Sequence, residues 1–250
     1  MARSVVPHRR WLLLCHAAPV GHEQLEGLMV RPATVPATLA ETLTAGIADE
    51  VAAVYGDQVV FPAQVVVDDP RDGQRLFPGW PAPVLVIARE NQGVVSWGVP
   101  LGDPSPPVLV GGNLGDPTPD RMGTQVYAPS VDAFVSARRW DQSCLAGQPL
   151  VQAQADVLDA DVLAVLRAGF GEVAATAGWP GHTQYRFEGP NVRLMLWSGL
   201  HQCDWWLSGA DHDALADCVP HLMALSNLRE AFWSSDPGGD AVLKDVRAAR

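Results

Sequence analysis

Lysine is almost absent from this chain: Lys244 is the only lysine among 17 basic residues, and all the others are arginine. Acidic residues number 28, so the formal net charge is −11. An acidic chain without a basic cluster is a poor candidate for binding a phosphate backbone. The same charge argues against electrostatic binding to a membrane surface. We therefore expect no direct nucleic-acid or membrane partner, and a protein partner would be basic.

Cysteine and long apolar runs are also scarce. The four cysteines, Cys15, Cys144, Cys203 and Cys218, form no C-x-x-C pair, so the sequence suggests neither a zinc site nor a redox motif. Reduced thiols of a cytoplasmic protein are the expectation. No apolar run approaches the roughly 18–20 residues that span a bilayer. Residues 9–15 weakly resemble an export signal, but their apolar stretch is short and we favour a docked strand in the irregular segment 1–35.

Common catalytic motifs are missing as well. The sequence contains no G-x-S-x-G, H-E-x-x-H or G-x-G-x-x-G. The glycine-rich residues 111–115 lead into acids and prolines rather than a helix, so a surface loop is favoured over a phosphate site. Asp211-His212-Asp213 fits a helix start better than a metal site. His201 and Cys203 leave open a minor enzyme alternative, but we expect no catalytic residue, cofactor or metal.

The first half of the chain predicts, in order, a helix, a short strand, three further strands and a second helix. Thr38 and Glu41 form a capping box before a helix over 39–55. Strands are expected at 65–67, 83–88, 94–99 and 108–110, and a loop at 111–129. Ser130 can cap a helix through about residue 146.

The second half repeats the order helix, strands, helix. Pro149 marks a boundary, and Asp156 or Asp159 can cap the next helix. Strands follow at 184–188, 192–197 and 203–207, then a helix from Asp211 to about residue 228 and a loose tail over 232–250. Without βαβ alternation, this order predicts an α+β fold with antiparallel pairing.

Loop acids and tryptophans are the candidates for contact with a partner. A solvated turn at residues 68–72 is one interpretation, and an acidic contact patch for an arginine-rich partner is the other. Trp205 and Trp206 are adjacent on a strand and point to opposite faces, so one is core and the other is covered by a helix or exposed. The candidate partner-binding residues are Asp68, Asp69, Asp72, Trp80, Asp103, Asp116 and Trp206.

One stretch resembles a known family. Residues 83–99 read PVLVIARENQGVVSWGV, and Pro106-Pro107-Val108 follows. An apolar strand, ENQG, a strand ending in WGV and then PPV resemble the core hairpin of the SUKH superfamily, which includes Smi/Knr-type fungal regulators and bacterial immunity proteins. Residues 39–56 and 130–134 resemble its flanking helices, and 185–206 resemble the strand-rich half of longer actinobacterial members.

The resemblance spans roughly residues 36–230. It implies a SUKH-like central, largely antiparallel sheet flanked by helices over 36–148, with an α+β half over 149–231 packed on it. It also implies a non-enzymatic immunity protein that binds and blocks a nuclease- or deaminase-like toxin. Asn91 and Gly93 would shape a turn with positive φ, and Trp97 would anchor the core. An adaptor in a larger assembly or biosynthetic system is the alternative.

Overall fold

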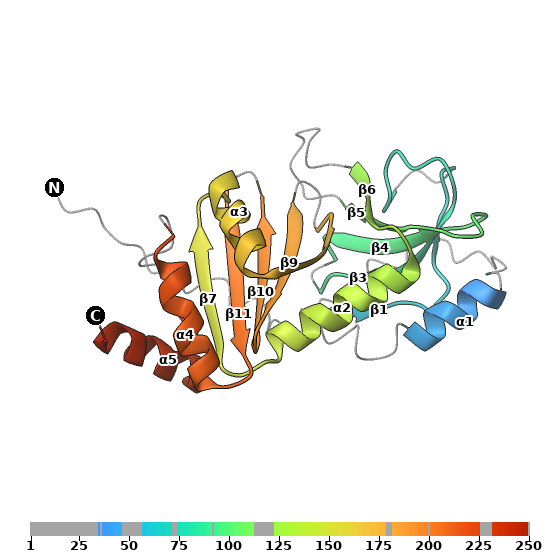
Figure 1. The fold of residues 1–250 in the computed structure, drawn as a ribbon. Coiled ribbons are helices and arrows are strands. Elements are labelled where there is room, and N and C mark those ends of the chain that lie inside the picture. The colour runs from blue at the N-terminus through green and yellow to red at the C-terminus, as the bar shows by residue number, and fades with distance from the viewer. Residues whose placement is uncertain are drawn as a thin grey trace.

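Two antiparallel sheets and five helices form the part of the chain that the computed structural model describes. That part comprises residue 35 and the ranges 37–46, 57–71, 75–91, 93–112, 123–178, 182–199, 201–225 and 232–249. Each sheet is antiparallel throughout, which confirms the α+β class with antiparallel pairing (Figure 1). The two sheets are separate, whereas the sequence predicted one central sheet with a strand-rich extension.

The first sheet contains six strands. They are β1 (Gln58–Val59), β2 (Val67–Asp68), β3 (Val84–Arg89), β4 (Val95–Pro100), β5 (Val108–Gly112) and β6 (Gly123–Ala128). Their order is β1-β3-β4-β5-β6, and β2 also pairs with β3. Every residue of β3 and β4 is buried. This confirms that the apolar run after Pro83 is a central strand.

Side chains cover both faces of this first sheet. Leu85, Ile87 and Trp97 pack on the side of helices α1 (Ala37–Gly46) and α2 (Val131–Leu145). Val84 and Val86 point the other way, onto Phe77. Trp97 is 2% exposed and lies edge-on to Tyr127, as its predicted core role requires. In the β3–β4 turn, Gly93 has a φ of +73°, whereas Asn91 does not adopt positive φ, so that part of the prediction was wrong.

Gly98 provides a test of this packing. A Cβ at position 98 would lie 2.5 Å from Phe77 Cζ and 2.5 Å from Val84 Cγ1. We expect Gly98→Ala to lower the free energy of unfolding by about 1–3 kcal/mol, because the added methyl overpacks a filled core. Urea denaturation measures it, with Gly169→Ala as the control, since a Cβ there meets no atom within 4 Å. Equal midpoints for the two variants would contradict this packing argument.

The second sheet contains five strands in the order β7-β11-β10-β9-β8. Its strands are β7 (Leu150–Ala155), β8 (Gly171–Thr176), β9 (Thr183–Gly189), β10 (Val192–Ser198) and β11 (Cys203–Gly209). One face carries the larger core, which includes Trp205 and is covered by α3 (Ala160–Gly169), α4 (His212–Met223) and α5 (Pro237–Ala248). Figure 1 shows α4 and α5 beside β7, at the end of the molecule away from α1.

Several expectations needed correction. Residues 123–128 form β6 within the predicted 111–129 loop, and β7 and β8 were not predicted. The tail predicted to be loose contains α5, because Asp236 accepts hydrogen bonds from the backbone N–H groups of Gly238 and Gly239 and starts that helix. Helix α1 begins at Ala37, before the predicted cap Thr38. The rest of the predicted helix, the segment 1–34 and Cys15 lie outside the described residues.

Helix α2 runs past both sheets (Figure 1). Ser130 caps it by accepting a hydrogen bond from the Ala133 N–H, as predicted. Its apolar side, with Val131, Phe134 and Val135, packs on the first sheet. Trp140 and Cys144, further along, pack against Met195 of β10 in the second sheet. Helix α2 therefore packs against both sheets.

Candidate partner-binding surface

A buried ion pair joins α2 to the second sheet. Arg186 of β9 and Asp141 of α2 are both fully buried. The Arg186 Nε donates to Asp141 Oδ1 at 2.7 Å, and a second guanidinium nitrogen donates to Oδ2 at 2.9 Å. Burial raises the pKa of Asp141, and the charge of Arg186 opposes that rise. Because a guanidinium stays charged and donates to both oxygens, we take the carboxylate to be ionised at neutral pH.

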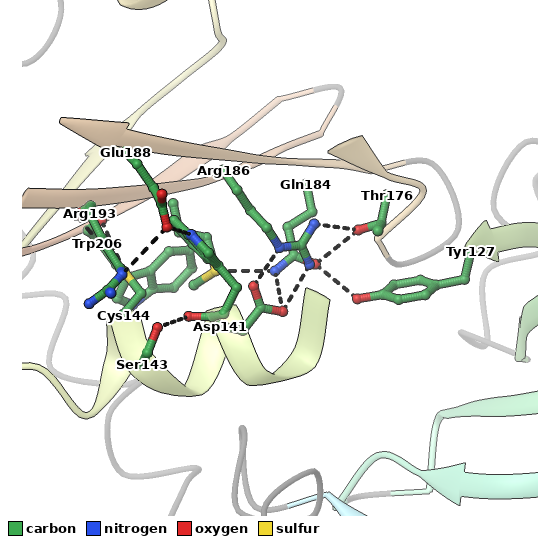
Figure 2. Close-up of polar contacts among 12 residues, drawn as sticks. Tyr127, Asp141, Ser143, Cys144, Thr176, Gln184, Arg186, Glu188, Arg193 and Trp206 are labelled. Atoms are coloured by element: carbon green, nitrogen blue, oxygen red, sulfur yellow. Dashed lines mark hydrogen bonds and ion pairs between the residues drawn. The ribbon is translucent and has the colours of Figure 1, made fainter. Parts of the chain in front are cut away.

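Three further polar side chains complete this network, as Figure 2 shows. The Gln184 amide donates to Asp141 Oδ2 at 3.1 Å, and its oxygen accepts from the Tyr127 hydroxyl at 3.2 Å. Arg186 also donates to the Thr176 hydroxyl at 3.0 Å. Tyr127 lies on β6 and Gln184 on β9, so the network connects the two sheets. Its members are buried, and a satisfied buried network fixes an arrangement rather than serving an external ligand.

A second buried pair ties α2 to the chain ahead of β1. Arg138 donates to the Asp57 carboxylate, and both side chains are 1% exposed. The Arg138 guanidinium lies 4.8 Å from the centroid of the Trp97 ring, a cation–π distance. Burial raises the pKa of Asp57 to about 6 even though Arg138 opposes the rise. Trp97 is thus linked to α2 as well as to the core.

The Asp57 pKa predicts a pH dependence. An acid whose folded-state pKa lies above its unfolded value adds stability at low pH, and this is lost as the pH rises through the folded pKa. Relative to Asp57→Asn, the wild type should therefore lose about 3 kcal/mol of unfolding free energy between about pH 4 and pH 7, for a shift of about two units. Urea titrations across that range test this, and parallel pH profiles would refute it.

The acids predicted at residues 68–72 do not form an exposed patch. Asp68 is fully buried and accepts hydrogen bonds from the backbone N–H groups of Leu76 and Phe77, and its carboxylate also pairs with Arg75. Asp69 is 4% exposed and pairs with Arg71. Both carboxylates hold the loop before β3, so neither is available to a partner, and the expectation that they are accessible was wrong.

The other candidates are distributed unevenly. Asp103 is exposed in the β4–β5 loop, and its carboxylate accepts from the Ser105 N–H. Trp80 is half-buried against the core that contains Phe77. Asp72 and Asp116 lie outside the described residues. The structure does not bring Asp103, Trp80 and Trp206 together as one surface, since Trp206 lies on the second sheet.

The residues of the enzyme alternative lack the features of a nucleophilic pair. Cys203 is fully buried in the core of the second sheet, and burial raises the pKa of its thiol to about 12. His201 is exposed. Asp211 caps α4 by accepting from the Ala214 N–H, as predicted. Among the described residues, no group of three or more His, Cys, Asp or Glu could hold a metal ion.

Tryptophans gather on the second face of the second sheet, the face on which α2 packs against β9, β10 and β11. Trp233 bridges Gln152 at the β7 edge, and Gln152 pairs with Trp206. The adjacent row pairs Gln154 with Asp204 and Asp204 with Trp197. Directly opposed residues in an antiparallel pair share a face. We call this set the tryptophan face: Gln152, Gln154, Trp197, Asp204, Trp206 and Trp233.

Asp204 is the charged group of the tryptophan face. Its Oδ1 accepts from the Gln154 amide at 2.9 Å and the Gln202 amide at 2.8 Å, and Oδ2 accepts from Gln202 at 2.7 Å. Burial raises the pKa of Asp204, while the two glutamine hydrogen bonds and the charge of His182 lower it. These three hydrogen bonds hold the carboxylate in position, and the residue as a whole is half-buried.

No family model, curated protein or solved structure matches this chain. Trp206 is half-buried on the α2 side and Trp205 is core, which confirms that the pair divides between the two faces. No described helix is long and apolar enough to cross a membrane.

Sequence reasoning placed Trp206 at a binding surface but missed its neighbours. The alternation of Asp204 and Trp206 along one strand was visible in the sequence. The cross-strand partners Trp197 and Gln154 depend on register. Trp233 is 38% exposed and is placed on the same face by its bridge to Gln152 of β7. No local sequence pattern predicts that bridge.

Proposed function

We propose that this chain is a non-enzymatic protein-binding protein of the immunity type, which binds a basic toxin domain and blocks its active cleft. The observation that carries the proposal is the tryptophan face, where three partly exposed indoles share one side of the sheet with a positioned carboxylate, on an acidic chain. Tryptophan is enriched among the residues that dominate interface energies, because it buries a large area at little entropic cost.

A run of exposed acids that follows β7 supplies the electrostatic part of the proposal. The strand β7 ends beside the Asp204 row, and the chain continues into Asp156, Asp159 and Asp161, all exposed. A negative surface raises the association rate with a basic partner and is screened by salt. Nuclease- and deaminase-like domains present basic clefts to nucleic acid, which such a surface can occupy.

The mechanism is steric occlusion of the toxin's cleft, so no covalent bond is made or broken. A binding surface works best when its side chains are held by a rigid support. Here the buried network of Asp141 and Arg186 fixes α2 against β9, and Cys144 and Trp206 pack together next to it. The tryptophan face is thereby held in one geometry before the partner arrives, which reduces the ordering cost of binding.

The test uses the full chain as bait in lysate of its native host at low salt. We expect recovery of a basic protein that is toxic when expressed alone and is neutralised by co-expression of this chain. High salt should weaken the complex. Recovery of no specific protein at low salt, or of a partner whose activity is unaffected, would overturn the proposal. Capture of a whole multi-subunit assembly without toxicity would favour an adaptor instead.

A further inference from the structure

The tryptophan face combines aromatic rings with a single carboxylate. Trp197 and Trp206 meet edge to face, with centroids 6.1 Å apart and planes at 89°. Asp204 is the direct cross-strand neighbour of Trp197 and stands two residues from Trp206 on the same side of β11. A carboxylate thus lies beside two indoles, all three half-buried.

We propose that this arrangement binds an arginine side chain of the partner, with its guanidinium paired to Asp204 and stacked on the indole of Trp206. The inference deepens the proposed function and rests on it, since it names the chemical group that the face recognises. A carboxylate has about four acceptor positions. Asp204 Oδ1 accepts two hydrogen bonds and Oδ2 accepts one. Oδ2 therefore has room for another donor.

Charge and shape together select arginine. A half-buried carboxylate favours a cation, and an indole face attracts cations through its quadrupole. Lysine also carries the charge, but its compact ammonium is strongly hydrated and does not stack. A guanidinium is planar, weakly hydrated and able to donate two parallel bonds to a carboxylate. The net charge of −11 adds long-range attraction for such a partner.

Two of the chain's own basic residues, Arg193 and His182, lie near this position. Arg193 is exposed on the same side of β10 and is opposite Ser208, two residues from Trp206, but its guanidinium lies 3.8 Å from the Glu188 carboxylate. His182 lies near Asp204 and lowers its pKa, but Asp204 hydrogen-bonds to glutamines rather than to an arginine.

Capped hexa-arginine, hexalysine and hexacitrulline peptides test the proposal with the full chain. Citrulline keeps the planar shape of arginine without its charge. Calorimetry gives the affinities, and heteronuclear NMR follows the indole N–H signals of Trp197 and Trp206. We expect hexa-arginine to bind about tenfold more tightly than hexalysine and to shift both indole signals, and hexacitrulline not to bind measurably. This arm needs no variant, so it stands even if a substitution unfolds the chain.

Variants then locate the site. Asp204→Asn and Trp206→Leu should each weaken hexa-arginine binding about tenfold. Asp213→Asn removes the same charge from an exposed position in the first turn of α4 and should change binding less than about twofold. Equal affinity for arginine and lysine peptides, or equal losses in Asp204→Asn and Asp213→Asn, would overturn the proposal.

The outcome is separable from that of the proposed function. If a captured toxin bound the Asp204→Asn variant as tightly as the wild type, the arginine-site proposal would be refuted and the immunity proposal would be kept. If the chain bound hexa-arginine selectively but neutralised no toxin, the immunity proposal would be refuted and the arginine-site proposal would be kept.

Discussion

Replacing Asp141 by asparagine is expected to lower the free energy of unfolding by about 3–5 kcal/mol. The change keeps the side-chain shape but removes the charge that balances Arg186, and both positions are fully buried. An unpaired guanidinium in the interior carries its whole desolvation cost. The new amide N–H group would also face the donors of Arg186 and Gln184. Urea denaturation followed by tryptophan fluorescence measures the loss.

An exposed pair is the matched control for that variant. Arg167 and Glu172 make the same type of bond, with Arg167 Nε donating to Glu172 Oε2 at 2.7 Å, but at the surface. Arg167→Gln should leave the denaturation midpoint unchanged, because solvent screens exposed ion pairs. If Asp141→Asn also left the midpoint unchanged, the carboxyl would be protonated in the fold, and our account of the network would be wrong.

Local patterns predicted the elements that carry their own signals. The helix after Ser130 has a capping side chain and an apolar stripe, and the strand after Pro83 has an unbroken apolar run. Both therefore appeared where expected. Strand β8 lacks such signals, since its residues are mostly exposed and include Ala174 and Ala175, which have low strand propensity. Pairing with β9 makes it a strand, and such pairing is invisible in a local window.

The candidate site shows the same limit. Asp68 and Asp69 sit in a stretch of turn residues, which predicted solvent exposure, but the chain returns and places backbone N–H groups of residues 76 and 77 on the Asp68 carboxylate. Such contacts cannot be read from composition. The pair of Trp205 and Trp206 was predictable because strand alternation alone separates their faces. The neighbours that make Trp206 part of a surface come from three other chain segments.

Helix α5 is the element for which the sequence expectation failed most, and its removal should have the largest effect. Val242, Leu243 and Val246 are buried in the core of the second sheet. Burial of each such side chain is worth about 1.5–3 kcal/mol. Deleting residues 237–250 therefore removes about 5–9 kcal/mol, comparable to the whole stability of a typical domain. We expect the truncated chain to lose its cooperative unfolding transition, measured by near-ultraviolet circular dichroism.

Point variants separate packing from the mere loss of chain. Leu243→Ala should cost about 2–5 kcal/mol, whereas the adjacent Lys244→Ala should leave the midpoint unchanged, because Leu243 is 1% exposed and Lys244 faces solvent. The start of α5 is also tied to β7, since Asp236 Oδ2 accepts from the Leu150 N–H at 2.9 Å. β7 carries Gln152 and Gln154 of the tryptophan face, so the truncation should abolish hexa-arginine binding as well. A truncated chain that still unfolds cooperatively and binds the peptide would show that α5 only covers a sheet stable without it.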